Sequence, residues 1–331
     1  MEYAKLGRSN MTVSKICLGT MHFGGYTTED EACRIMDKAL DMGINFFDTA
    51  NRYGPQPGQT EEIIGRWFKQ GGGRRDKVVL ATKVYGPMPD PAIPNEEPGI
   101  SAYKVRKHVA DSLRRLQTDH IDLYQIHHID RQISLEEFWS TFDHLIAKGD
   151  VLYMGTSNFP GWGLAKYQMH AWNHGMVGFV SEQPQYNLLN RYPELEVIPA
   201  AREFGIGIIP YMPLAGGLLT GKKQSEQGSR TQQVEGDYKL SLINNEQFEA
   251  YSALCKEIGE KETVVAIAWT LANPAVSSAI VGVRTVGHLD GLDRAASLKL
   301  EPKHMAKLDE IFNINRGRPL RSSEAPHAFA W

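Results

Sequence analysis

The sequence predicts an α/β protein built as a (β/α)8 TIM barrel. Short runs rich in β-branched and aromatic residues alternate with longer amphipathic runs, and eight strands of this kind fit within 331 residues. Such alternation indicates parallel strands joined by helical crossovers, with an open doubly wound sheet as the alternative. No Gly-x-Gly-x-x-Gly motif follows a strand, so the usual dinucleotide fingerprint of the open sheet is missing. We expect one domain over residues 1–331, with about 315–331 as a C-terminal tail.

The elements follow one another along the chain. The expected barrel strands are 15–19, 44–50, 77–84, 121–127, 151–158, 179–183, 206–213 and 277–283. The expected helices are 29–43, 60–70, 101–117, 134–149, 161–175, 193–205 and 286–297. Thr28 before Glu31 and Ser134 before Glu137 have the spacing of capping boxes, which supports two of these helix starts.

Three further segments extend the minimal barrel. Residues 2–16 predict a β-hairpin around Gly7 to Asn10 that plugs the N-terminal end of the barrel. Residues 85–99 and 215–242 are long loops that follow strands, on the face where barrels build their sites, so they are candidate substrate loops, with disorder as the alternative.

Composition excludes several classes of protein. Hydrophobic residues make up 42% of the chain and the net charge is −3, which argues against disorder and against nucleic acid as a partner. No apolar run approaches the roughly 20 residues that a membrane span needs, and no signal core is visible at the N-terminus. The odd set Cys17, Cys33 and Cys255 fits neither a disulfide framework nor a zinc site, so we expect a protein of the reducing cytoplasm.

Four polar residues lie at neighbouring strand ends. Asp48 ends the second strand and Tyr53 follows it, Lys83 lies near the end of the third strand, and His127 ends the fourth. The carboxyl ends of barrel strands meet at one rim, so these side chains converge there. His128 points to the opposite face from His127, which argues against a shared metal, and we expect no metal site.

The convergent residues can support reduction of a carbonyl group. Such a reduction needs a proton donor at the developing alkoxide, and a tyrosine phenol has a reference pKa of about 10. A Lys83 ammonium beside Tyr53 favours the phenolate and lowers that pKa, and Asp48 holds the ammonium in place. His127 is placed to orient the substrate oxygen, while Tyr85 and His128 are expected to line the substrate pocket.

With this constellation the sequence resembles the aldo/keto reductase superfamily. The likeness runs from about Tyr3 to Ala296 and follows an ordered set of blocks: GINFFDTANRYG, TEEIIG, LATK, DLYQIH, GTSNF, EQPQYN, PYMPLAGGLLTGK and GVRT. The resemblance implies a tetrad of Asp48, Tyr53, Lys83 and His127 on a (β/α)8 barrel, with Tyr53 as general acid and a nicotinamide cofactor as the hydride donor.

The same resemblance implies a set of cofactor-binding residues. For the nicotinamide end these are Ser157, Asn158, Gln183 and Tyr211. For the pyrophosphate and adenosine end they are Pro213, Leu214, Gly216, Leu218, Lys222, Arg230, Gly282, Arg284 and His288. The cations favour NADP(H) over NAD(H), since a helix start beside a cation is a phosphate site. His288 and Leu292 depart from the family pattern, which leaves some use of NAD(H) open.

Alternatives remain at this stage. The likeness is strongest to bacterial branches that include sugar ketoreductases and aldehyde reductases, so a keto-sugar or a small aldehyde is expected as the substrate. Potassium-channel β subunits share the fold and the cofactor, so a cofactor-binding regulatory subunit is the alternative function. A barrel aldolase or isomerase with Lys83 as a Schiff base is a second alternative. The sequence leaves open whether the chain forms a homo-oligomer.

Overall fold

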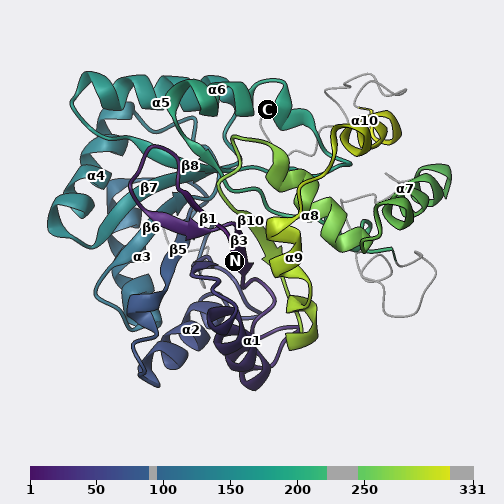
Figure 1. Ribbon diagram of the computed structural model, residues 1–331. Coiled ribbons are helices and arrows are strands. Elements are labelled where there is room, and N and C mark those ends of the chain that lie inside the picture. Colours follow the sequence, from purple (N-terminus) through teal and green to yellow (C-terminus); the bar gives the residue numbers. More distant parts are fainter. Residues whose placement is uncertain (89–94, 222–244, 314–331) are drawn as a thin grey trace.

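A computed structural model describes residues 1–88, 95–221 and 245–313. Eight parallel strands form one sheet in the order β10-β3-β4-β5-β6-β7-β8-β9, and helices surround it (Figure 1). The strands are β3 (Ile16–Gly19), β4 (Phe46–Asp48), β5 (Val79–Val84), β6 (Ile121–Ile126), β7 (Val151–Ser157), β8 (Phe179–Gln183), β9 (Gly207–Ile208) and β10 (Ala279–Gly282). All eight strands expected from the sequence are therefore confirmed.

Hydrogen bonds between the two edge strands and the residues next to them close the sheet into a barrel. The amide of Ser277 donates to the carbonyl of Ile208 over 2.8 Å, and the amide of Ile280 donates to the carbonyl of Pro210 over 2.9 Å. β9 is much shorter than the strand expected over 206–213. Pro210 and Pro213 lie in that stretch, and a proline has no N–H to give to a strand ladder.

Helices follow the strands as the periodicity predicts. Those anticipated from the sequence are α1 (Glu29–Asp41), α2 (Gln59–Lys69), α3 (Ala102–Leu116), α4 (Leu135–Lys148), α5 (Gly161–Asn173), α6 (Val197–Phe204) and α9 (Leu292–Ser297). Both expected caps form, because the hydroxyl of Thr28 accepts the amide of Glu31 and that of Ser134 accepts the amide of Glu137. The helix expected over 286–297 is split into a 3-10 turn, Val286–Leu289, and α9, because Gly291 has a φ of 84°.

Three helices lie outside the segments singled out in the sequence. They are α7 (Asn245–Ile258), α8 (Glu262–Ala272) and α10 (Pro302–Ile311). α7 and α10 lie side by side at the outside of the barrel (Figure 1), where Lys307 pairs with Glu257 over 2.7 Å. Residues 315–331, expected as a tail, lie outside the described part of the chain, as does most of the loop expected over 215–242.

The N-terminal hairpin covers one end of the barrel, as expected. It consists of β1 (Tyr3–Lys5) and β2 (Thr12–Ser14), which pair in antiparallel fashion across the ring of strands (Figure 1). Leu6 and Val13 are fully buried in the barrel interior. A Cβ on Gly7 would lie 2.3 Å from the carbonyl oxygen of Val180, so this turn needs a glycine to approach the strands closely.

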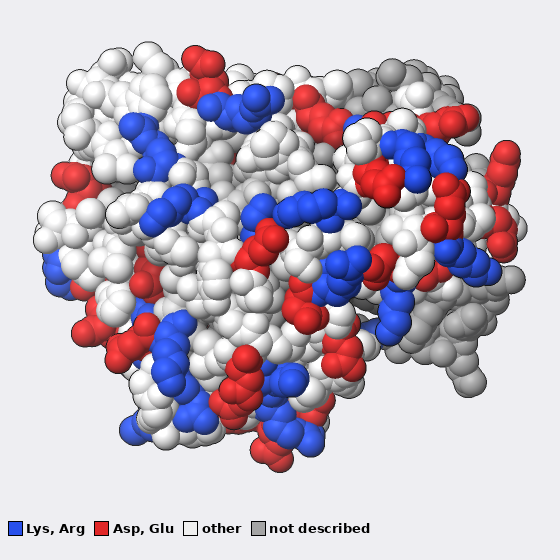
Figure 2. All heavy atoms as spheres, viewed as in Figure 1, with Lys and Arg blue, Asp and Glu red and all other residues white. Residues whose placement is uncertain are grey.

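The apolar residues form two packed layers. The inner layer fills the barrel and includes Leu6, Cys17, Phe46, Leu123 and Ile209, and a larger layer lies between the strands and the surrounding helices. On the face that carries the hairpin, cationic and anionic side chains are interspersed over the described residues (Figure 2). None of the described helices combines the length and the apolar character that crossing a membrane requires.

Candidate active site

A buried ion pair lies at the carboxyl end of the barrel. Lys83, on β5, donates from Nζ to Oδ2 of Asp48 at the end of β4 over 2.5 Å. The same ammonium donates to the carbonyl of Thr49 over 2.9 Å and to the hydroxyl of Tyr53 over 3.3 Å. Both charged side chains are almost fully buried, so the pair is shielded from solvent. The structure thus brings three of the four expected residues into one hydrogen-bonded chain.

Two glutamines orient Asp48, and only Gln183 is among the site residues expected from the sequence. Gln125 and Gln183 each donate from Nε2 to Oδ1 of Asp48 over 2.9 Å, and Gln183 also donates to Oε1 of Gln125. Asp48 therefore accepts hydrogen bonds on both oxygens from three side chains. The sequence carried a signal for Gln125. Leu123, Gln125 and His127 occupy every second position in β6 and directly after it, so their side chains point to the same face of the strand.

His127 completes the group at the end of β6. Its amide donates to the carbonyl of Val84, and its ring lies edge-on to the ring of Tyr53 with centroids 5.8 Å apart. His128 lies beside Tyr85, with ring centroids 5.4 Å apart, and both are half-buried. The two residues expected at the substrate pocket thus lie together at the same rim as the ion pair.

Burial and neighbouring charges set the protonation states. Burial lowers the pKa of Lys83, but Asp48 and Tyr53 raise this pKa by a larger amount. The net pKa therefore lies above 10.5, and Lys83 remains an ammonium. Burial raises the pKa of Tyr53 above 10, and Lys83 opposes this rise without overcoming it. The net lowering of the Tyr53 pKa expected from the sequence is therefore absent. Burial and the charges of Lys83 and Arg52 hold the pKa of His127 well below 6.5, so its imidazole is neutral at pH 7.

Amide groups follow the ends of the next strands. Asn158, with a φ of 58°, donates from Nδ2 to the carbonyl of His127 and to Oγ of Ser157, both over 3.1 Å. Tyr211 donates from its hydroxyl to Oδ1 of Asn158 over 3.1 Å. Ser157 donates to the carbonyl of Gln183 over 2.9 Å. Four residues expected at the nicotinamide end are therefore linked to one another and to the rim.

A glycine-containing loop follows β9. It holds Pro213, Leu214, Gly216 and Leu218, and includes the 3-10 turn Ala215–Gly217. Gly216 has a φ of 68° and Gly217 one of 106°. The amides of Gly217 and Leu218 donate to the carbonyls of Leu214 and Ala215 over 2.9 and 3.4 Å, so the turn is closed by its own backbone hydrogen bonds. Lys222 and Arg230, expected to bind phosphate, lie outside the described residues.

The segment after β10 lies against the start of α1. Arg284 donates from its amide to Nδ1 of His288 over 3.2 Å, and its guanidinium lies 5.8 Å from the ring of Tyr26. Gly282 ends β10 and is exposed. The amide of Val286, at the start of the turn expected to bind phosphate, donates to Oε1 of Glu31 over 2.8 Å. The carboxylate of Glu31, on α1, thus occupies one of the backbone N–H groups expected to bind phosphate there.

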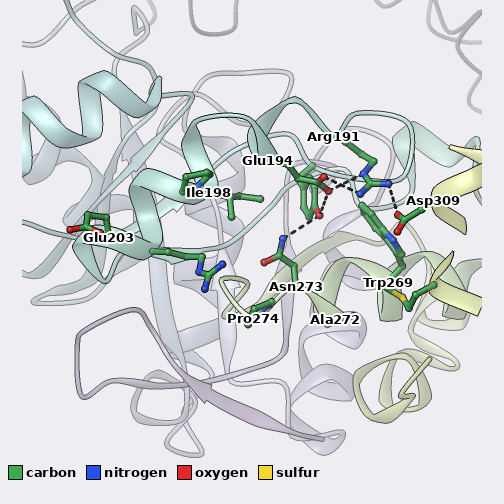
Figure 3. Close-up of a pocket in the computed structure, with 13 residues that line it drawn as sticks. Arg191, Glu194, Ile198, Glu203, Trp269, Ala272, Asn273, Pro274 and Asp309 are labelled. Carbon is green, nitrogen blue, oxygen red and sulfur yellow. Dashed lines mark hydrogen bonds and ion pairs between the residues drawn. The ribbon is translucent and has the colours of Figure 1, made fainter. Parts of the chain in front are cut away.

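A cavity of about 730 Å³ lies elsewhere, between α6, α8 and α10 (Figure 3). Its wall carries Arg191, which pairs with Glu194 over 2.9 Å and with Asp309 over 2.6 Å. Asn273 donates to the hydroxyl of Tyr186 over 3.3 Å in the same wall. None of the residues expected in the tetrad lines it. The cavity is therefore separate from the candidate active site.

A closed α/β barrel with this cluster at its carboxyl rim defines a class of barrel oxidoreductases. The model of the aldo/keto reductase family matches residues 15–313, and the chain belongs to that family. It is an oxidoreductase that acts on carbonyl groups of small molecules.

Named relatives cover nearly the whole chain. It is 50% identical to "Uncharacterized oxidoreductase YrpG" of Bacillus subtilis (strain 168), over 100% of both chains. It is 32% identical to norsolorinic acid reductase B of Dothistroma septosporum, over 96% of this chain and 83% of the relative. It is 30% identical to a probable voltage-gated potassium channel subunit beta of Arabidopsis thaliana, over 96% of this chain and 99% of the relative.

Proposed function

We propose that this protein reduces an aldehyde or a ketone to the alcohol with NADPH, and that Tyr53 is the general acid. The observation that carries the proposal is the hydrogen-bonded chain from Asp48 through Lys83 to the hydroxyl of Tyr53. A phenol with a raised pKa keeps its proton at neutral pH, so it is ready to donate. The ammonium at 3.3 Å then stabilises the phenolate that remains after the proton has left.

Each of the other three residues has a role in this step. Asp48 fixes the position of the ammonium and balances its charge in the buried site. His127, neutral at pH 7, offers one ring N–H to the carbonyl oxygen and orients it toward Tyr53. Tyr85 and His128 form the adjoining wall for the rest of the substrate. The pairing of Lys83 with Asp48 and Tyr53 also keeps it charged, which disfavours a Schiff-base mechanism.

The rim fits a nicotinamide ring and its carboxamide. A carboxamide needs acceptors for its NH2 group, and Asn158 Oδ1 has a second lone pair beyond the bond from Tyr211. No hydrogen bond among the described residues uses Oε1 of Gln183. Tyr211 is half-buried beside these acceptors and offers a ring face for stacking. When bound, the nicotinamide supplies the hydride.

The rest of the cofactor is assigned to two further segments. Pro213, Leu214, Gly216 and Leu218 would lie along the pyrophosphate, where Gly216, with a φ of 68° and no Cβ, permits a close approach of the backbone. Gly282, Arg284 and His288 would lie at the adenosine end, and the cation of Arg284 supports NADP(H) over NAD(H).

The buried free thiols of Cys17 and Cys255 support a reducing, cytoplasmic setting.

The test is steady-state oxidation of NADPH, and separately of NADH, with a panel of aldehydes, ketones and keto-sugars. We expect Tyr53→Phe to lower kcat by at least about 100-fold while NADPH binding is kept. Tyr103→Phe, on the exposed surface of α3, is the matched control and keeps full activity. Retained turnover in Tyr53→Phe would refute the assignment of the acid. Tight NADPH binding with no turnover across the panel would instead favour a regulatory subunit, the class to which the relative named as a potassium channel subunit beta belongs.

A further inference from the structure

Arg52 stands at the mouth of the candidate active site with its charge unpaired. It directly precedes Tyr53 in the loop after β4, and its side chain is exposed. Across the described residues, no carboxylate pairs with its guanidinium and no hydrogen bond uses it. The exposed Arg66, in contrast, pairs with Glu29 over 2.7 Å. An unpaired guanidinium beside reacting groups is available to a ligand.

The backbone on both sides of Arg52 is held in place. The amide of Asn51 donates to the carbonyl of Lys83, and the amide of Tyr53 donates to the carbonyl of Ala50. Asn51 Nδ2 lies 3.1 Å from Nδ1 of the buried His108, whose Nε2 lies 2.9 Å from Oε2 of Glu96. These bonds fix the direction in which the Arg52 side chain leaves the loop.

The side chain of Arg52 lies over the end of β5. A Cβ built on Gly86 would come within 3.0 Å of Arg52 Nη1 and 3.2 Å of its Cδ. A larger residue at position 86 would therefore displace the guanidinium. In this position the charge of Arg52 lowers the pKa of both Tyr53 and His127, which places it near the two groups that face the substrate.

The described groups around the mouth leave this positive charge uncompensated. Asp48 is neutralised by Lys83 at 2.5 Å. Burial and the charge of Asp130 raise the pKa of Tyr85, and the oxygens of Asp130 accept hydrogen bonds from the amides of Ile100 and Gln132. No ion pair among the described residues links Asp130 to Arg52.

We propose that Arg52 is a specificity-determining residue that binds an oxyanion on the substrate, so that the preferred substrates are carbonyl compounds bearing a carboxylate or a phosphate. This inference rests on the proposed function, since it names the substrate class of the same site. A guanidinium binds either oxyanion through paired N–H donors, which ties the anionic end of the substrate next to Tyr53. The carbonyl is thereby positioned for proton transfer.

The test compares anionic and neutral substrates of matched shape. The carboxylate pair is 4-carboxybenzaldehyde and methyl 4-formylbenzoate, and the phosphate pair is glyceraldehyde 3-phosphate and glyceraldehyde. We expect the wild-type protein to have a higher kcat/KM for at least one anionic member, and the pair that responds identifies the oxyanion. Arg52→Gln lowers the anionic-to-neutral ratio at least about tenfold, mainly through KM, and added salt lowers it in the wild type. Because the anionic-to-neutral ratio compares two substrates of the same variant, an effect of the substitution on Tyr53 that is common to both substrates cancels.

The control is Arg202→Gln, which removes the same charge from the exposed surface of α6 and leaves both ratios unchanged. Arg52→Lys restores part of the preference, since the charge returns without the paired donors. If the wild type turns over the neutral members equally well, or if Arg52→Gln keeps the wild-type ratio, the inference is overturned while the proposed function stands. If no member of either pair is turned over and the panel above also fails, the proposed function itself fails.

Discussion

Glu182 on β8 is a buried acid whose replacement should change the stability of the protein in a pH-dependent way. Its side chain is fully buried, and Oε1 accepts the amide of Phe159 over 3.2 Å. Oε2 has no hydrogen-bond partner among the described residues. Burial raises the pKa of this carboxyl from 4.5 to about 8. The folded protein therefore holds Glu182 protonated at neutral pH.

The sign and size of the effect follow from this pKa. Between 4.5 and about 8 the unfolded chain releases the Glu182 proton while the native state keeps it. The contribution of Glu182 to the free energy of unfolding is thus most favourable below pH 4.5 and becomes less favourable as the pH rises through this window. One pKa unit corresponds to about 1.4 kcal/mol, so this group lowers the stability by about 2 to 3 kcal/mol between about pH 5 and pH 7.

Glu182→Gln removes the titration and keeps a carbonyl oxygen for the amide of Phe159. Urea unfolding at about pH 5, 6 and 7 measures the effect. We expect the difference in stability between the variant and the wild type to shift in favour of the variant by about 2 kcal/mol over this range. Glu203→Gln, on the exposed surface of α6, is the control and shifts little. A difference independent of pH would refute a protonated Glu182 in the folded state.

Two other substitutions test the packing of the site and of the barrel. Asp48→Asn leaves the Lys83 ammonium buried without a counter-charge and should cost about 3 to 5 kcal/mol in urea unfolding, most of which Lys83→Met in the same chain restores; a double variant as unstable as the single one would contradict this. Gly65→Ala puts a Cβ 2.1 Å from the carbonyl oxygen of Arg115 and should lower the free energy of unfolding by about 1 to 3 kcal/mol. Gly287→Ala is the control, because the nearest atom to its Cβ is 4.0 Å away, and it should lower the free energy of unfolding by less than Gly65→Ala does.

The sequence determined the order and type of the barrel strands and of the helices between them, because those signals are local, whereas α7, α8 and α10 were not anticipated. Alternating and helical periodicity predicted all eight barrel strands, and the caps at Thr28 and Ser134 marked true helix starts. It also predicted that Asp48, Lys83 and His127 meet, since the carboxyl ends of barrel strands share one rim. Local exceptions went unnoticed, such as the break at Gly291.

Tertiary structure alone decided the interactions between side chains far apart in the chain. Gln125 reaches Asp48 across 77 positions, Glu31 takes the amide of Val286 across 255, and His108 holds the loop before Tyr53. The protonation of Tyr53 likewise follows from burial outweighing Lys83, a balance that depends on how closely the surrounding elements pack. Periodicity tells which face of an element is buried, whereas which polar atoms meet there depends on the packing of all the elements at once.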